Sequence, residues 1–313
     1  MGSQLCRSLA RKGHEVMILD NFSSSTLSDL RDVLDLGVAL IEGDCKNPRE
    51  VKRALANAKI VFHFAANPEV RLDHSDPSTC FSENVYATHV LFEQVKRSEA
   101  ETIVFASSST VYGEARLVPT PENYTPLEPI SVYGASKLAS EALISAYCHT
   151  YGKKGVILRF ANIVGPNNGH GVIRDFLTEL MRNPERLKIL GDGHQSKSYL
   201  HVDDCISAIL EAIRMANGTI DVFNIGSEDQ IEVTRIAKIV REETNLNEVP
   251  LEFAGEALDG KGWKGDVKNM LLDISKLKSN GWRPRYSSEE AVRLIVRSAL
   301  SYYEPRISSE ISS

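Results

Sequence analysis

The sequence predicts an α/β protein with a doubly wound parallel sheet in its first half and a smaller α/β lobe after it. Short apolar runs alternate with helical segments in the first half, at 15–20, 38–41, 60–66 and 103–106. This alternation is typical of parallel strands joined by crossover helices. Each run is followed by small or polar residues, as expected at the carboxyl edge of such a sheet, where ligands bind.

Composition narrows the class of protein further. The 313 residues are 42% hydrophobic and 25% charged, with a net charge of −6, which argues against nucleic-acid and anionic-membrane partners. No apolar run approaches the roughly 20 residues that span a bilayer. The five scattered cysteines form no Cys-x-x-Cys pair, so we expect reduced thiols, no metal site and a cytoplasmic location.

The chain opens with the second half of a βαβ unit. Residues 2–13 read as an amphipathic helix that Gly13 ends, and residues 15–20 read as a strand that ends in Asp20. In a complete unit, a strand and a glycine-rich turn come before this helix. We therefore expect a sheet that lacks its first strand, and an N-terminally truncated chain.

Two acids follow the first two expected strands. Asp20 is placed to accept a hydrogen bond from a free ribose 2′-hydroxyl, which favours NAD over NADP; the alternative is a turn residue, since Asn21 and three serines follow. Asp44 follows the run at 38–41 and is the second candidate for cofactor binding. Its alternative role is an N-cap for a helix over 48–56. Both alternatives stay open.

The third strand, at 60–66, ends in small residues that allow a nucleotide to approach the backbone. His63 lies inside this apolar run and is better explained as a hydrogen-bonded core histidine than as a catalyst. A helix is expected over 82–97. The pattern changes after Pro166, so we divide the chain into lobes of 1–165 and 166–313.

The centre of the chain carries an acid/base pattern. The strand at 103–106 ends in Ser107-Ser108-Ser109, and Tyr133 and Lys137 stand at i and i+4 of a predicted helix, on one face. A phenol titrates near about 10, and a nearby ammonium favours the phenolate. If the fold brings Ser108 to Tyr133, the three side chains can move a proton on a substrate hydroxyl. The alternative is an ordinary helix surface.

The segments SSSTVYG (107–113) and YGASK (133–137) resemble the extended short-chain dehydrogenase/reductase superfamily. More narrowly, they are similar to the NAD-dependent nucleotide-sugar epimerase/dehydratase family, in its archaeal and prokaryotic UDP-glucose 4-epimerase-like branch. The resemblance covers essentially the whole chain. It implies a Rossmann-like NAD-binding lobe, a nucleotide-sugar lobe, and Ser108, Tyr133 and Lys137 as catalytic residues.

The resemblance also implies which residues bind each ligand. The cofactor-binding residues would be Gly2, which matches only the third glycine of the family turn, and Asp20, Asn21, Asp44, Cys45, Phe64, Ala65, Ala66, Asn84, Tyr133, Lys137 and Ala161. The substrate-binding residues would be Ser108, Tyr133, Asn162, Val172, Lys197 and Asp266. Lys197 stands where the family commonly has arginine, and Arg159 would belong to the hinge between lobes or to a buried ion pair.

The implied reaction is epimerisation at C4 of a UDP-hexose through a transient 4-keto sugar, with NAD as cofactor. Ser109 and Thr110 stand where dehydratases of the family carry Asp-Glu, which favours epimerisation over loss of water. The resemblance also implies a homodimer. Two alternatives remain: a truncated, non-catalytic nucleotide-sugar-binding protein, and a related enzyme such as a hexuronate epimerase or a reductase.

Overall fold

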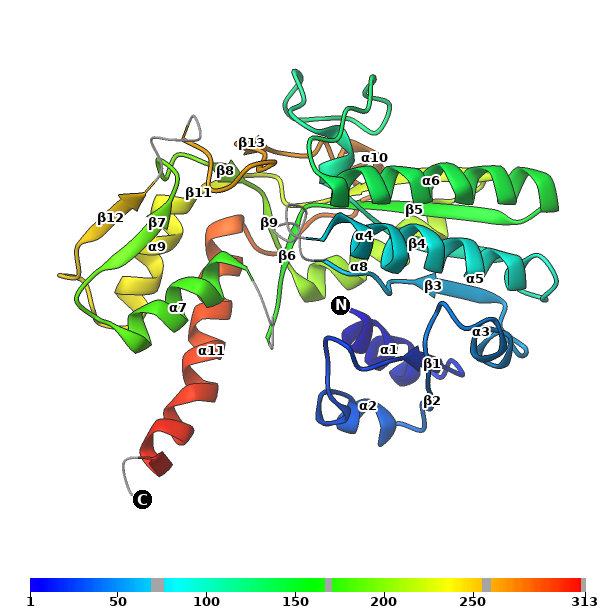
Figure 1. Ribbon diagram of the computed structural model, residues 1–313, viewed down its shortest axis with the longest axis horizontal. Coiled ribbons are helices and arrows are strands. Elements are labelled where there is room, and N and C mark those ends of the chain that lie inside the picture. The colour runs from blue at the N-terminus through cyan, green and yellow to red at the C-terminus, as the bar shows by residue number, and fades with distance from the viewer. Residues whose placement is uncertain (69–75, 167–170, 255–259, 311–313) are drawn as a thin grey trace.

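The computed structural model describes residues 1–68, 76–166, 171–254 and 260–310, in two lobes (Figure 1). The helices and strands of the first lobe are α1 (Gly2–Arg11), β1 (Met17–Asp20), η1 (Leu27–Leu30), α2 (Arg31–Leu34), β2 (Ala39–Glu42), α3 (Pro48–Ala54), β3 (Ile60–His63), α4 (Pro77–Cys80), the π-helix η3 (Phe81–Tyr86), α5 (Ala87–Val95), β4 (Thr102–Ser108), η4 (Ser109–Tyr112), α6 (Val132–Tyr151), β5 (Lys154–Phe160), α8 (Val202–Met215), β10 (Ile220–Ile225) and α10 (Ser275–Lys278).

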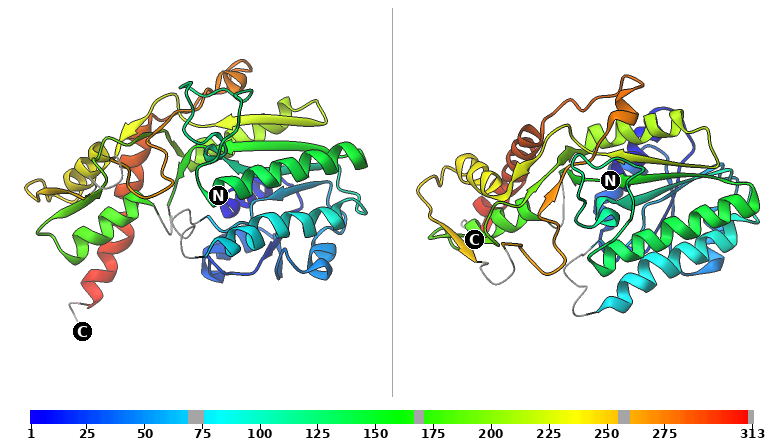
Figure 2. Two further views of the ribbon diagram at one scale, coloured as in Figure 1. Left: turned by 45° about the horizontal axis from the view of Figure 1, so that its top comes forward. Right: turned by 90° about the horizontal axis from the view of Figure 1, so that it is seen from above.

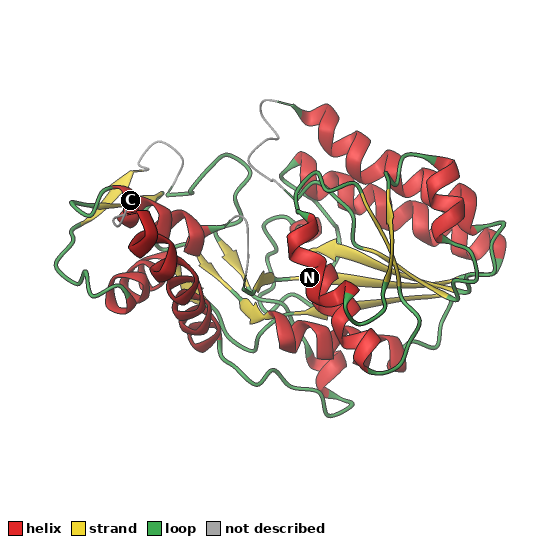
Figure 3. Ribbon diagram, turned by 90° about the horizontal axis from the view of Figure 1, so that it is seen from below, coloured by secondary structure: helices red, strands yellow, loops and turns green. Residues whose placement is uncertain are grey.

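A four-stranded parallel sheet, in the order β10-β5-β4-β3, organises this lobe. Successive residues of β4 point to opposite faces, and each face has its own helices. Phe105 packs with α5 and α6, whereas Val104 packs with α1 and α8. Figure 3 shows α1, which begins at N, crossing in front of the strands. The predicted doubly wound α/β sheet is therefore confirmed.

β1 and β2 form a parallel pair of their own, apart from the main sheet. Among the described residues, no strand pairs with both β1 and β3, which is the gap that the sequence predicts for the first strand. No residue of β1 is fully buried, and Met17 is 47% exposed. α1 holds this part of the chain to the main sheet, because Leu5 is buried with Val104 and Leu158.

The second lobe contains β6 (Asn162–Val164), α7 (Val172–Arg182), β7 (Leu187–Leu190), β8 (Ser196–Lys197), β9 (Tyr199–His201), β11 (Ile231–Glu232), α9 (Val233–Glu243), β12 (Leu251–Ala254), β13 (Asn269–Met270) and α11 (Ser288–Glu310). Its core lies between α7, α9 and α11 (Figure 2). The chain passes back to the first lobe for α8 and β10, so the main sheet includes residues from both sides of position 165.

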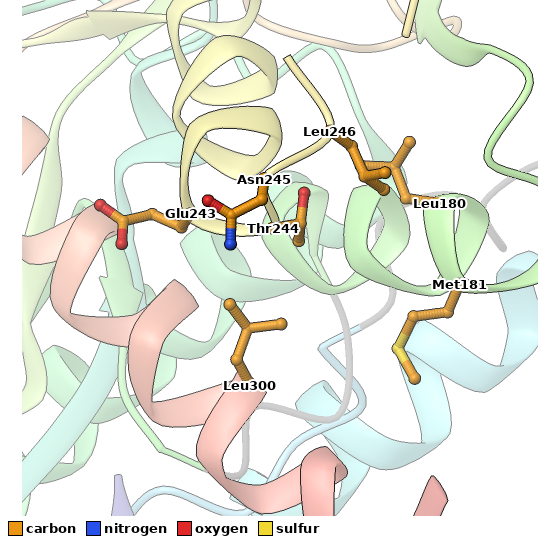
Figure 4. A pocket seen from close by; sticks show the side chains of 7 residues that line it. All are labelled: Leu180, Met181, Glu243, Thr244, Asn245, Leu246 and Leu300. Carbon is orange, nitrogen blue, oxygen red and sulfur yellow. The ribbon is translucent and has the colours of Figure 1, made fainter. Parts of the chain in front are cut away.

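A pocket of about 220 Å³ lies in the second lobe between α7, α11 and the end of α9 (Figure 4). It is lined by Leu180, Met181, Glu243, Thr244, Asn245, Leu246 and Leu300. None of the residues that the sequence assigns to a site lines this pocket.

Arginine and glutamate side chains join α9 to α11 on the surface of the second lobe. Arg293 contacts Glu242, Glu243 and Glu289, with the contact to Glu243 at 3.0 Å. Arg235 and Arg297 extend this network on either side. Networks of this kind stabilise a protein more than isolated surface pairs do.

We expect Arg293→Met to lower the free energy of unfolding by about 1 kcal/mol, because methionine keeps the apolar stem and loses three carboxylate partners. Urea denaturation at low and high salt measures the loss, which salt should reduce. The control is Lys59→Met, which breaks one pair between side chains 60% and 74% exposed and should change stability very little. An equal loss in both variants would contradict the stabilising effect of the network.

Candidate active site

One face of α6 lies against the carboxyl end of β4. The helix begins at Ser131, whose hydroxyl caps it by accepting a hydrogen bond from the Gly134 N–H at 3.0 Å. A side chain at Gly134 would lie 2.8 Å from the Thr110 carbonyl oxygen, so glycine lets α6 approach η4 closely. Tyr133 and Lys137 stand one turn apart on this face, as the sequence predicts.

Ser108 and Tyr133 are in contact, which is the condition that the predicted acid/base site requires. The Ser108 hydroxyl oxygen accepts hydrogen bonds from the N–H and the hydroxyl of Thr110, at 3.2 and 3.0 Å. Its own hydrogen is left to donate to the Tyr133 oxygen, and this hydrogen bond lowers the pKa of the phenol. Thr110 therefore sets the direction in which Ser108 donates.

Lys137 is 3% exposed and donates to the Ala106 carbonyl oxygen at 2.9 Å. Burial lowers its pKa to about 8, against an ordinary value of 10.5. Burial also raises the pKa of Tyr133 to about 12, with Ser108 acting in the opposite direction. The expectation that Lys137 holds the pKa of Tyr133 below 10 is wrong for this structure, because the desolvation of the phenolate is the larger effect.

Asn84 lies beside this centre and is 2% exposed. Its side chain accepts from the Asn67 N–H at 2.9 Å and donates to the Ser136 hydroxyl at 2.8 Å. It thereby connects the segment after β3 to the second turn of α6. The sequence predicts one regular helix here, whereas the structure has a π-helical turn, a feature often found at functional sites.

His63 is confirmed as a core residue. It is 3% exposed, and its Nε2 lies 2.9 Å from the Thr88 hydroxyl oxygen. Burial lowers the pKa of His63 to about 3, so the ring is neutral at physiological pH. The ring therefore carries no positive charge in that range.

The two acids expected at the adenosine end lie at the ends of β1 and β2. The Asp20 carboxylate accepts from the Phe22 N–H at 2.8 Å, so it does form the turn that was the alternative reading. Asn21 donates to Asp44 at 3.1 Å and so joins the two strand ends. The alternative role of Asp44 as a helix cap is wrong, because Asn47 caps α3.

Most of the remaining predicted cofactor residues follow the ends of strands, whereas Gly2 begins α1. Three of them, Phe64, Ala65 and Ala66, follow β3, and Ala161 follows β5. Burial raises the pKa of Cys45 to about 11, so its thiol stays protonated. A Cβ on Gly2 would meet no atom within 4 Å. No close contact in the described residues therefore requires a glycine at this position.

This set of groups fits NAD. Acidic side chains at the ends of β1 and β2 suit ribose hydroxyl groups and an adenine amino group, and the small residues after β3 leave room for the nucleotide. The N-terminal end of α1 adds a positive dipole near the same edge. No cluster of side chains that could hold a metal ion occurs within the described ranges.

Four of the predicted nucleotide-sugar residues lie in the second lobe, in β6, α7 and β8 and in the segment before β13. Lys197 and Asp266 form an ion pair, and the Lys197 ammonium lies 5.0 Å from the centre of the Trp263 ring. Asp266 is 3% exposed. Asn162 donates to the Ser198 carbonyl oxygen at 3.3 Å, and Val172 is the first residue of α7. The sequence assigns both Lys197 and Asp266 to the substrate, and the ion pair brings them together from 69 positions apart in the chain.

Sequence reasoning missed Glu141. It lies one turn beyond Lys137 on the same face of α6, and both are buried. It pairs with Arg159 at 2.7 Å, which confirms the alternative of a buried ion pair for that arginine. The signal was present, since Tyr133, Lys137 and Glu141 follow a spacing of four residues.

A doubly wound sheet with serine, tyrosine and lysine at its carboxyl edge defines a nucleotide-dependent enzyme of the short-chain dehydrogenase/reductase class. Residues 1–226 match the model of the NAD dependent epimerase/dehydratase family. The chain belongs to this family, and NAD is its cofactor.

Relatives named as UDP-glucose or UDP-galactose 4-epimerases cover nearly the whole chain. A UDP-glucose 4-epimerase of Corynebacterium glutamicum is 28% identical over 96% of this chain and 92% of its own. A crystal structure of a UDP-galactose 4-epimerase is 39% identical, with a TM-score of 0.85, and covers 96% of this chain and 95% of its own. The Thermotoga maritima UDP-glucose 4-epimerase with UDP-glucose is 30% identical, also with a TM-score of 0.85, over 97% and 96% of the two chains.

No helix in the described part of the chain combines the length and apolar character that crossing a bilayer requires.

The lowered pKa of Lys137 has a measurable consequence for stability. Because the unfolded chain holds this proton up to about pH 10.5 and the folded chain only to about pH 8, burial of the ammonium destabilises the protein below pH 8. We expect Lys137→Met to raise the free energy of unfolding at pH 7 by about 2 kcal/mol, after about 1 kcal/mol is lost with the hydrogen bond to Ala106.

Chemical denaturation at pH 7 and at pH 10 measures this effect. The stabilisation should be full at pH 7 and largely gone at pH 10, because stability of the native protein rises with pH between about 8 and 10.5. A variant that is less stable than the native protein at pH 7 would contradict the stated cost of the buried ammonium.

Proposed function

We propose that this protein epimerises the C4 carbon of a UDP-hexose, such as UDP-glucose or UDP-galactose. The observation that carries the proposal is the contact between Ser108 and Tyr133, with Lys137 one turn away. Thr110 binds Ser108 at 3.0 Å, in the place where a dehydratase needs an acid. Within the described residues, the site offers groups to move one hydroxyl proton and no second acid and base to expel water.

Tyr133, Ser108 and Lys137 each have a separate role in the proposed reaction. Tyr133 in its phenolate form takes the proton of the C4 hydroxyl and later returns it, and Ser108 hydrogen-bonds the same hydroxyl to orient it. The Lys137 ammonium, fixed by Ala106, supplies positive charge that stabilises the phenolate as it forms. NAD supplies the hydride chemistry at C4 when it is bound.

The nucleotide end is proposed from the second lobe. Lys197 and Asp266 form an ion pair and Lys197 lies against Trp263, so that a cation, a carboxylate and an aromatic ring can meet a diphosphate, a ribose and a base. The relatives named for UDP-glucose and UDP-galactose support UDP as the carrier.

All five cysteines are free thiols, which supports a cytoplasmic location.

We expect Tyr133→Phe to lower turnover by about 1,000-fold without loss of folding, because only one hydroxyl is removed. The assay follows conversion of UDP-galactose to UDP-glucose, and thermal melting reports folding. Tyr151→Phe, near the other end of α6 and 45% exposed, is the matched control and should keep native turnover. Native turnover in Tyr133→Phe would rule out the proposed mechanism.

We also propose a homodimer that pairs the outer faces of α5 and α6 with their two-fold mates. Large apolar side chains are exposed beside these helices: Phe81 at 62%, Tyr86 at 46% and Tyr151 at 45%. Exposed aromatic residues on neighbouring helices are typical of such an interface.

Sedimentation velocity at micromolar concentration tests the dimer. We expect the native chain to sediment as a dimer and Phe81→Arg with Tyr86→Arg to shift it to a monomer, because charges are then buried in the interface. Phe253→Arg, at a residue 51% exposed in β12 of the second lobe, should leave the dimer intact. A native monomer at this concentration would contradict the proposal.

A further inference from the structure

The face of α6 that carries Tyr133 and Lys137 continues for one more turn to Glu141. Each of these three residues holds one of three consecutive residues at the end of β4. Tyr133 is hydrogen-bonded to Ser108, Lys137 Nζ donates to the Ala106 carbonyl oxygen at 2.9 Å, and the Ser107 hydroxyl donates to Glu141 Oε1. The helix therefore fixes the strand end at every residue from 106 to 108.

Glu141 is itself held rigidly by Arg159 of β5. Arg159 Nε donates to Oε1 at 3.0 Å and Nη2 donates to Oε2 at 2.7 Å, and the two side chains are 5% and 6% exposed. Two parallel hydrogen bonds between planar groups leave the carboxylate one orientation. The oxygen that accepts from Ser107 is thus set by the neighbouring strand.

Arg159 is itself held by hydrogen bonds to Tyr112 and to the Glu122 backbone. Its Nη1 donates to the Tyr112 hydroxyl at 3.0 Å and to the Glu122 carbonyl oxygen at 3.1 Å. The Tyr112 hydroxyl donates to Asn224 of β10 at 2.8 Å. Hydrogen bonds run without a break from β10 to Ser107, and every side chain on this path is buried.

We propose that Glu141, held by Arg159, is a positioning residue for the reaction: it fixes Ser107 and thereby aims the neighbouring Ser108 at Tyr133. Glu141 touches neither NAD nor sugar in this role and acts only through the strand end. The inference rests on the proposed function for its effect on turnover. It differs from a purely structural role because a loss of positioning lowers turnover more than stability or substrate affinity.

Ser107→Ala is the sharpest test, because it cuts the link to the strand and leaves the pair of Glu141 and Arg159 intact. We expect kcat to fall by about 10- to 100-fold, as for small misplacements of catalytic groups, with KM unchanged and the melting temperature lowered only slightly by the loss of one buried hydrogen bond. Ser107→Thr keeps a hydroxyl and should restore most of kcat. Native kcat in Ser107→Ala would overturn the proposal.

A second variant removes the pair as a unit. Glu141→Leu with Arg159→Met leaves no unpaired buried charge, and such replacements are often tolerated by the fold. We expect kcat to fall at least as far as in Ser107→Ala, with KM unchanged. A folded double variant with native kcat would mean that the pair has a structural role only.

A measurement without turnover separates this inference from the proposed function. The ¹³Cζ resonance of Tyr133, assigned by its loss in Tyr133→Phe, reports the hydrogen bond from Ser108. It should shift in Ser107→Ala and stay near its native position in Ser107→Thr. If the native chain turns over no UDP-hexose and this shift is seen, the proposed function fails and the positioning role stands. An unmoved resonance would overturn the positioning role.

Discussion

The buried pair between Arg159 and Glu141 is the interaction on which the site depends. Burial of two charges is unfavourable unless hydrogen bonds satisfy both, and here Ser107, Tyr112 and the Glu122 carbonyl complete the set. The pair joins β5 to α6 below the catalytic face. Since α6 carries Tyr133 and Lys137, the register of this helix on the sheet decides whether they reach Ser108.

The same packing explains the electrostatics of the site. Lys137 is buried without a carboxylate bonded directly to its ammonium in the described contacts, so its pKa falls to about 8, while the nearby Glu141 acts to raise it. Burial in the same surroundings raises the pKa of Tyr133 to about 12. Burial therefore favours loss of the proton from Lys137 and retention of the proton by Tyr133. Such shifts lower stability and are common at catalytic sites.

Much of this arrangement could be predicted from local sequence patterns. The periodicity of strands and helices gives the sheet, and the spacing of Tyr133 and Lys137 gives their shared face. The pairing of Lys197 with Asp266 could not be predicted, because 69 positions separate them and only the fold brings them together. The π-helical turn around Asn84 was equally hidden, since its sequence reads as ordinary helix. The pKa of Tyr133 was misjudged because sequence gives neighbours but not burial.

The fate of the hydrogen at C4 tests the central claim most directly. UDP-galactose carrying deuterium at C4 would be incubated with the purified protein, and the UDP-glucose formed would be analysed by mass spectrometry. The claim predicts that the product keeps its deuterium, because the hydrogen that leaves C4 returns to C4 within one site. Formation of UDP-glucose with its deuterium lost to water, or no formation of UDP-glucose at all, would contradict it.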